Sequence, residues 1–363
     1  MALPDLGFAV ADGLIVEVLG GTVPESGREF SALAGFIDIH NHGAVGHDVN
    51  STTVDDLLKV AAYLAGNGVT SWVPTLVPDS DENYRQVIDT LDELMVKQVG
   101  KPIAQAVGVH YEGVFANHAM CGALRAEYFK RYSGREIDEL PRLRSGVHMI
   151  TLAPEIEGGI ELIRDLVERG WIVSIGHTAA GPDVLDKALE ADTRLITDFG
   201  NAMGGVHHRS VGAVGWGLTN DDVTFDIIAD GVHVDPRVVA MACRAKGVDK
   251  VSMISDSVAP TGLGDGEFEL WGGKISVIDG RTRNAKGAIA GSVSTMLEGA
   301  RLLRELGFGD DEIEKMTSLN AARLLGLDGD RGSLEVGKRA DVVGLDRKGN
   351  IAFTMIGGQM VGE

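Results

Sequence analysis

Ala34-Gly35-Phe36-Ile37-Asp38-Ile39-His40-Asn41-His42-Gly43 reads as a short apolar strand that ends in two histidines. Side chains alternate between the two faces of a strand, so His40 and His42 are expected on the same face. Two imidazoles side by side at the end of a strand can bind a divalent metal ion, and the glycine that follows suits a turn of the backbone. The alternative is a pair of surface histidines at the edge of a loop.

The composition is that of an ordinary soluble protein. The chain of 363 residues is long enough for one large domain, alone or with a small second one. The net charge of −20 argues against nucleic acid and anionic membrane surfaces as partners, since both call for a basic face. It does not exclude an anionic substrate, because one local Arg or Lys can outweigh the global field at contact distance.

The two cysteines, Cys121 and Cys243, are too few for a disulfide framework, which indicates a reducing compartment. The N-terminus shows no basic segment followed by an apolar core. No apolar run approaches the ~20 residues that are needed to span a bilayer. We therefore expect a cytoplasmic protein.

From Gly35 onward, strand-like and helical stretches alternate. Helices are predicted at 52–67, 81–97, 160–169, 182–191 and 236–246, and strands at 70–73, 103–111, 172–175, 195–199, 224–228 and 251–254. This alternation predicts a parallel sheet, and its length suits a closed (β/α)₈ barrel of the TIM type. An open doubly wound sheet is the alternative, but no G-x-G-x-x-G stands at a first strand-to-helix turn.

Both ends of the chain are predicted to be β. Two apolar runs, residues 7–10 and 14–19, flank Ala11-Asp12-Gly13, a favourable hairpin turn. The C-terminal residues 332–345, 351–355 and 359–361 read as a turn and short strands. Each end is small to fold by itself. We expect residues 1–34 and 331–363 to form one small β-sandwich domain beside a barrel of residues 35–330.

Polar side chains stand where the predicted strands end, which is where parallel α/β folds collect reacting groups. These side chains are His40, His42, Glu112, His177, Asp198, His233 and Asp256. Any one of them alone is more often a cap or a satisfied polar group. Seven together are hard to attribute to loop composition, and a mixture of imidazole and carboxylate suits Zn²⁺, Mn²⁺ or Fe²⁺ better than Mg²⁺.

Several motifs carry a resemblance to a known family. Residues 35–43 look like the first-strand motif of the amidohydrolase superfamily, and residues 332–341 (G-S-L-E-V-G-K-R-A-D) are similar to its C-terminal β signature. Within the superfamily, the chain most resembles the N-acetylglucosamine-6-phosphate deacetylases. The matching stretches are residues 110–115, 176–178, 201–203, 229–233, 255–262, 290–292 and 320–322. Because they span most of the chain in order, the chain is identified as a member of this superfamily.

The resemblance implies a divalent metal centre. Glu112 and His177 would be metal ligands, and His40 and His42 would hold a metal in those members that bind two ions. Asp256 would be the catalytic carboxylate, taking a proton from water and delivering it to the departing nitrogen. Zn²⁺ is the expected ion, with Mn²⁺ or Fe²⁺ as alternatives and one or two ions per chain.

The resemblance also implies the substrate contacts. Arg209 and His233 match the positions that contact the sugar phosphate, in part across the interface of a homodimer. Asn201 and Ala202 fall where the family contacts its substrate by side chain and backbone.

The chain departs from the family at Asp198, where a histidine usually ligates metal. A carboxylate can still ligate, but it is shorter and adds a negative charge. Together with Glu112 and Asp256 it makes three carboxylates, which favours two divalent ions. The rival interpretation is one ion on His40, His42 and Asp256.

A second departure is Leu124, which stands where the family has a histidine that helps to polarise the amide carbonyl. Leucine cannot donate a hydrogen bond, so this role is empty or supplied elsewhere. His118 on the same loop, or His207 and His208 beside Arg209, are candidates to contact the substrate there. The alternative for all three is a solvated loop histidine.

The expected function is metal-dependent hydrolysis of a non-peptide amide, with N-acetylglucosamine 6-phosphate or a related N-acyl amino-sugar phosphate as substrate. The first alternative is an amidohydrolase that acts on a different N-acyl compound or a cyclic amide, which Leu124 and Asp198 favour. The second is a non-catalytic relative that binds sugar phosphates.

Overall fold

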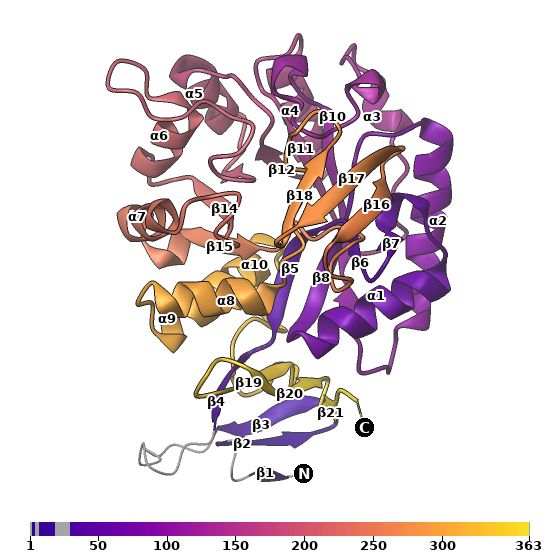
Figure 1. Cartoon of the computed structure of the whole chain (residues 1–363), viewed down its shortest axis with the longest axis vertical. Helices are drawn as coiled ribbons and strands as arrows, with labels where there is room; N and C mark the ends of the chain where they lie inside the picture. Colours follow the sequence, from indigo (N-terminus) through magenta and orange to yellow (C-terminus); the bar gives the residue numbers. More distant parts are fainter. Residues whose placement is uncertain (1, 4–6, 19–29, 363) are drawn as a thin grey trace.

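The structure is a computed structural model that describes residues 2–3, 7–18 and 30–362. Its centre is a ring of eight parallel strands (Figure 1). They are β5 (Phe36–Asn41), β8 (Val69–Leu76), β10 (Gly108–Phe115), β11 (Val147–Leu152), β12 (Ile172–Ile175), β13 (Leu195–Ile196), β14 (Thr224–Ile228) and β15 (Val251–Ile254). Each pairs with the next in sequence order, and β9 (Gln105–Ala106) adds a short pairing to β8. The predicted (β/α)₈ class is confirmed.

The first and the last strand meet at the carboxyl-terminal mouth of the barrel. The Asp256 N–H donates to the His40 carbonyl at 3.0 Å, and the His42 N–H donates to the Ser257 carbonyl at 2.7 Å. Below them, the buried Asp38 carboxylate accepts from the Ser255 hydroxyl at 2.6 Å. These bonds join the histidine strand directly to the segment that carries Asp256.

Helices surround the barrel, as Figure 1 shows. They are α1 (Val54–Gly66), α2 (Asp81–Lys97), α3 (Glu136–Glu139), α4 (Gly159–Glu168), α5 (Pro182–Glu190), α6 (Gly212–Thr219), α7 (Pro236–Lys246), α8 (Met296–Glu305), α9 (Asp310–Glu314) and α10 (Asn320–Leu324). α1 begins where the Thr53 side chain accepts the Asp56 N–H, and its apolar stripe from Leu57 to Leu64 is buried. α5 and α7 begin with proline in the first turn, where its missing N–H costs no hydrogen bond. None of the helices in the described ranges is long and apolar enough to cross a membrane.

The two ends of the chain form two sheets on one side of the barrel, where Figure 1 places both termini. One sheet contains β1 (Ala2–Leu3), β2 (Phe8–Ala11) and β3 (Leu14–Val18), and the other β4 (Phe30–Ala34), β19 (Val342–Asp346), β20 (Ile351–Ile356) and β21 (Gln359–Met360). Phe8 and Ile15 of the first pack against Val342 and Met355 of the second. The predicted sandwich is thereby confirmed. The domain boundaries remain a prediction, and the predicted end of β3 at Leu19 lies outside the described residues.

The structure departs from the predicted strands in three places: one predicted strand was wrong, and two regions of strand were not predicted. The strand predicted at 103–111 is two pieces, β9 and β10, and β10 continues to Phe115 because both of its faces are buried. β11 was missed, since a histidine interrupts its apolar run. A three-stranded antiparallel sheet of β16 (Gly266–Leu270), β17 (Gly273–Ile278) and β18 (Arg281–Asn284) follows the last barrel strand and was also missed. These strands are short, contain several charged residues and expose one face to water. The alternation of apolar and polar residues in their sequence is therefore weak.

Candidate active site

Three residues of the site share a left-handed backbone conformation. His177, Asp198 and Asp256 each stand two residues beyond the end of a strand, β12, β13 and β15 respectively. Their φ angles are +48°, +53° and +49°, in the left-handed region that side chains other than glycine rarely adopt. Such a conformation costs on the order of 1–3 kcal/mol and persists where the surrounding structure imposes it. It turns each side chain from its strand end into the mouth of the barrel.

The remaining three side chains of the site lie on or directly after β5 and β10, and they reach the mouth of the barrel differently. His40 lies within β5, His42 directly follows the last residue of β5, and Gly43 comes next with a φ of +139°. A Cβ on Gly43 would lie 2.0 Å from the carbonyl oxygen of His47, so only glycine fits there. Glu112 lies inside β10 rather than at its end, and the pairing with β11 shifts register after it.

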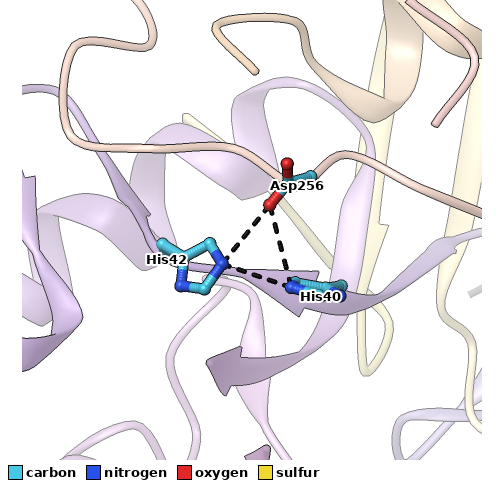
Figure 2. A group of neighbouring side chains, drawn as sticks. All are labelled: His40, His42 and Asp256. Atoms are coloured by element: carbon cyan, nitrogen blue, oxygen red, sulfur yellow. Dashed lines mark hydrogen bonds and ion pairs between the residues drawn. The ribbon is translucent and has the colours of Figure 1, made fainter. Parts of the chain in front are cut away.

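Figure 2 shows His40, His42 and Asp256 pointing toward one another. The Nε2 atoms of the two histidines are 3.2 Å apart, and Asp256 Oδ1 lies 3.3 Å from His42 Nε2 and 3.7 Å from His40 Nε2. Tetrahedral ligands about 2.1 Å from a Zn²⁺ ion lie about 3.4 Å from one another, so this triangle has the dimensions of a metal site.

A second group of ligand atoms shares His40. Glu112 Oε2 is 3.4 Å from His40 Nε2, and Glu112 Oε1 is 2.8 Å from His177 Nε2. On the other side of the ring, His40 Nδ1 lies 3.8 Å from Asp198 Oδ1. His40 with Glu112 and Asp198 therefore forms a second set of atoms that could hold a cation. The structure brings together all six side chains that the sequence singled out as metal ligands.

Hydrogen bonds behind the cluster assign the ring tautomers. His42 Nδ1 donates to the Thr75 carbonyl at 3.1 Å, and His177 Nδ1 donates to the Met120 carbonyl at 2.8 Å. In the neutral rings the lone pair then lies on Nε2, which faces the cluster. This arrangement is typical of histidines that bind metal.

Burial and charge act against each other in the cluster. Burial lowers the pKa of His42, but hydrogen bonds to Asp256 and Glu112 outweigh it and raise the pKa to about 9. Burial would raise the pKa of Glu112, yet the neighbouring His40 charge and hydrogen bonds hold it well below its usual range. Burial raises the pKa of Asp198 to about 6. The neighbouring carboxylates thus raise the pKa values of His40, His42 and His177 and stabilise their protonated forms.

Two buried atoms of the cluster lack a hydrogen-bond partner, His40 Nδ1 and Asp198 Oδ1. A buried polar atom that is left unpaired is costly, and a divalent cation satisfies both a lone pair and a carboxylate. The donor set and its spacing therefore fit a divalent metal ion.

A cavity of about 360 Å³ opens over the cluster. Asn201, Ala202 and His233, the residues that the resemblance implies as substrate contacts, are among its lining residues, and Leu124 contributes an apolar wall. Their contact with a substrate stays a prediction. No Lys or Arg of the described residues is among its lining residues.

His233 is fixed by a carboxylate that the sequence reasoning missed. Asp230 accepts the His233 Nδ1–H at 2.7 Å and the backbone N–H groups of Val232 and His233 at 2.8 Å. Burial lowers the pKa of His233, but Asp230 outweighs this and raises it. The spacing of three residues in Asp230-Gly231-Val232-His233 is the signal that could have revealed this pair.

Two predicted substrate contacts lie away from this cavity. Arg209 is on an exposed loop, where its backbone N–H donates to His207 Nδ1 at 3.3 Å. His118 lines a different cavity, of about 410 Å³, and its ring packs against Phe129. His207 and His208 are exposed and do not line the main cavity. No histidine among these three reaches the place that Leu124 occupies.

An eight-stranded parallel barrel with three imidazoles and three carboxylates buried at its carboxyl-terminal mouth defines a metal-dependent hydrolase. The chain belongs to the amidohydrolase family, whose model matches residues 31–361.

The relatives of this chain are deacetylases. It is 34% identical over 362 residues to the N-acetylgalactosamine-6-phosphate deacetylase of Escherichia coli O157:H7, covering 99% of this chain and 95% of that protein. It is 35% identical over 335 residues to the N-acetylglucosamine-6-phosphate deacetylase of Bacillus subtilis, covering 88% and 84%. The crystal structure of the N-acetylglucosamine-6-phosphate deacetylase from Thermotoga maritima is similar with a TM-score of 0.89 at 31% identity, covering 98% of this chain and 94% of that one.

Proposed function

We propose that this chain catalyses the metal-dependent deacetylation of N-acetylglucosamine 6-phosphate or of a closely related N-acyl amino-sugar phosphate. The observation that carries the proposal is a cluster of six candidate metal ligands at the floor of a cavity lined by Asn201, Ala202 and His233. This ligand cluster consists of His40, His42, Glu112, His177, Asp198 and Asp256. Relatives that match nearly the whole chain are deacetylases of two such sugar phosphates.

For the metal we propose two divalent ions, with Zn²⁺ as the first candidate. His40, His42 and Asp256 would hold one, and Glu112 with His177 or Asp198 the other. A bound divalent ion lowers the pKa of water toward ~7 and stabilises the negative charge on the carbonyl oxygen during attack.

In this proposal Asp256 is the general base and then the general acid. Its carboxylate takes a proton from the attacking water as the new C–O bond forms, and delivers it to the nitrogen as the C–N bond breaks. The products are a carboxylate and a free amino sugar. The carboxylate suits both roles because its Oδ1 faces the two histidines, while its Oδ2 is 3.8 Å from His233 Nε2.

For the phosphate we propose His233 from this chain and Arg209 from a second copy, as in a homodimer. The cavity of one described chain lacks a Lys or Arg, and the exposed Arg209 loop is free to approach a neighbouring copy. Since sugar phosphates cross membranes poorly, we propose that the enzyme works in the cytoplasm.

The proposal is tested with a substrate panel and an assay for released acetate. We expect the highest kcat/KM on N-acetylglucosamine 6-phosphate or its galactosamine epimer, and much lower values on the unphosphorylated sugars. Hydantoins and N-acyl amino acids represent the alternative amidohydrolase function, which Leu124 and Asp198 favour. Preferential turnover of those compounds would overturn the sugar-phosphate assignment, and binding without turnover of any panel member would identify a non-catalytic relative.

A further inference from the structure

The described residues contain five two-residue hairpin turns in which both central residues have positive φ. The turns are Asp12-Gly13 between β2 and β3, Val45-Gly46 between β6 (Gly43–Ala44) and β7 (His47–Asp48), Trp271-Gly272 between β16 and β17, Asp279-Gly280 between β17 and β18, and Gly357-Gly358 between β20 and β21. Positive φ at both positions is the mark of a type I′ turn, which favours Asn, Asp or Gly at the first position. Three of the turns follow this preference, and the other two have Val45 and Trp271 at the first position.

Tryptophan is a costly residue at this position. The φ of Trp271 is +52°, where a bulky side chain meets the following carbonyl. Strain of this kind gathers at functional sites, where the residue is needed for something other than the turn. The Asp279 turn in the same sheet shows that the hairpin geometry itself does not require an aromatic residue.

The location of Trp271 indicates what it is needed for. The indole lines the cavity over the ligand cluster, and its ring centroid lies 5.3 Å from that of His42 at an interplanar angle of 75°. Leu270 and Ile275 of the same hairpin pack into an apolar cluster with Val258, which follows Asp256 closely in the chain. Trp271 as a whole is half-buried, and its buried indole Nε1 has no hydrogen-bond partner, so packing alone holds the ring.

We propose that Trp271 is a specificity-determining residue whose indole forms the wall on which the sugar ring of the substrate stacks. A pyranose ring presents C–H groups on its faces, and an aromatic face is the usual protein surface for such a group. The hairpin β16–β17 carries this wall to the mouth of the barrel. The inference rests on the proposed function, because it assumes a cyclic amino-sugar substrate.

Kinetics of variants at the two turns of this sheet test the proposal. Trp271→Asn removes the wall and restores a preferred turn residue, Trp271→Phe keeps an aromatic face, and Asp279→Ala weakens the sheet at its distant, exposed turn. We expect Trp271→Asn to raise KM about 10–50-fold, the equivalent of losing roughly 50–100 Å² of apolar contact, with kcat nearly unchanged. Trp271→Phe should stay within about threefold of the original KM, and Asp279→Ala should leave KM unchanged. Relief of strain should leave Trp271→Asn as thermally stable as the original chain or more so.

Fluorescence supplies a second readout. Trp72, Trp171 and Trp216 are at most 5% exposed and line no part of this cavity. In the Asp256→Asn background, which should bind substrate without turnover, added N-acetylglucosamine 6-phosphate should change the indole emission. Adding Trp271→Phe should abolish the change.

The outcomes separate this inference from the proposed function. If the original chain hydrolyses amino-sugar phosphates but Trp271→Asn keeps its KM within twofold, the stacking wall is refuted. Loss of bound metal from Trp271→Asn, with KM unchanged in the metal-saturated enzyme, would show that the indole serves only to pack against His42. Absence of turnover by the original chain would instead refute the proposed function.

Discussion

The Nε2 atoms of His40 and His42 lie 3.2 Å apart, and both face the carboxylates of Glu112 and Asp256. Since His42 Nδ1 donates to a carbonyl, the neutral His42 ring presents a lone pair to its neighbour. Two such nitrogens stay this close only when a proton or a cation lies between them. The raised pKa values of both histidines favour their protonated forms in the metal-free chain, and the divalent ion proposed above would replace those protons.

This relationship predicts metal content. The purified chain should contain two equivalents of divalent metal, and His42→Ala should weaken binding of one of them by at least about 100-fold, because a direct ligand contributes more than an outer-shell group. Elemental analysis after dialysis measures both. His118→Ala is the matched control, since His118 lies in a separate cavity and should leave the content unchanged. A single equivalent in the original chain would favour the one-metal alternative.

Replacing the proposed proton carrier should stop the chemistry. Asp256→Asn keeps the shape and one ligating oxygen of the side chain but has no basic oxygen. We expect kcat to fall about 10³–10⁴-fold, near the upper range for loss of a general acid–base group, while at least one metal equivalent remains. Steady-state kinetics with a parallel metal assay checks this. Near-normal kcat would remove Asp256 from the proton-transfer role.

The stability of the metal-free chain should fall as the pH rises from about 6.5 to 9. The folded pKa of His42 is about 9, above its ordinary value of 6.5, so its charge stabilises the fold fully below pH 6.5 and this contribution is lost as the pH passes 9. Burial raises the pKa of Asp226 to about 7. Deprotonation of this buried carboxyl therefore also lowers the stability of the folded chain as the pH rises toward 7. Metal binding needs deprotonated rings and strengthens over this range.

Thermal denaturation with and without metal measures this linkage. The difference in Tm between the metal-loaded and the chelator-treated chain should widen steadily from pH 6.5 to pH 9. A constant difference would mean that the histidines do not exchange protons for metal.

The ligand cluster could be predicted from the sequence because its geometry follows from strand periodicity. Residues two apart on a strand share a face, which places His40 beside His42, and parallel strand ends meet at one mouth, which brings in His177 and Asp256. The left-handed backbone that aims the latter two could not be predicted, since it is imposed by tertiary packing.

Other parts of the site lacked a sequence signal. Trp271 lies in a hairpin whose strands are half exposed. The hydrophobic periodicity of the sequence therefore did not distinguish this hairpin from a loop. Leu124 was located, but leucine offers no polar group, and the structure brings none of His118, His207 or His208 to its place. In the proposed function, the position of Arg209 relative to a substrate would depend on a second copy, which one sequence does not describe.

The bond between Asp230 and His233 predicts a change in substrate binding and in its pH dependence. Asp230→Asn keeps an acceptor for the backbone N–H groups but removes the charge that raises the pKa of His233. We expect KM for the sugar phosphate to rise about 10-fold at pH 7.5, consistent with loss of one charge-assisted hydrogen bond. The rise in KM should be smaller at pH 6, where His233 is protonated again. Ser292→Ala is the control, because the Ser292 hydroxyl also donates to Asp230, at 3.1 Å, without touching the imidazole. A KM that rises equally at both pH values would show that Asp230 shapes the loop rather than the charge of His233.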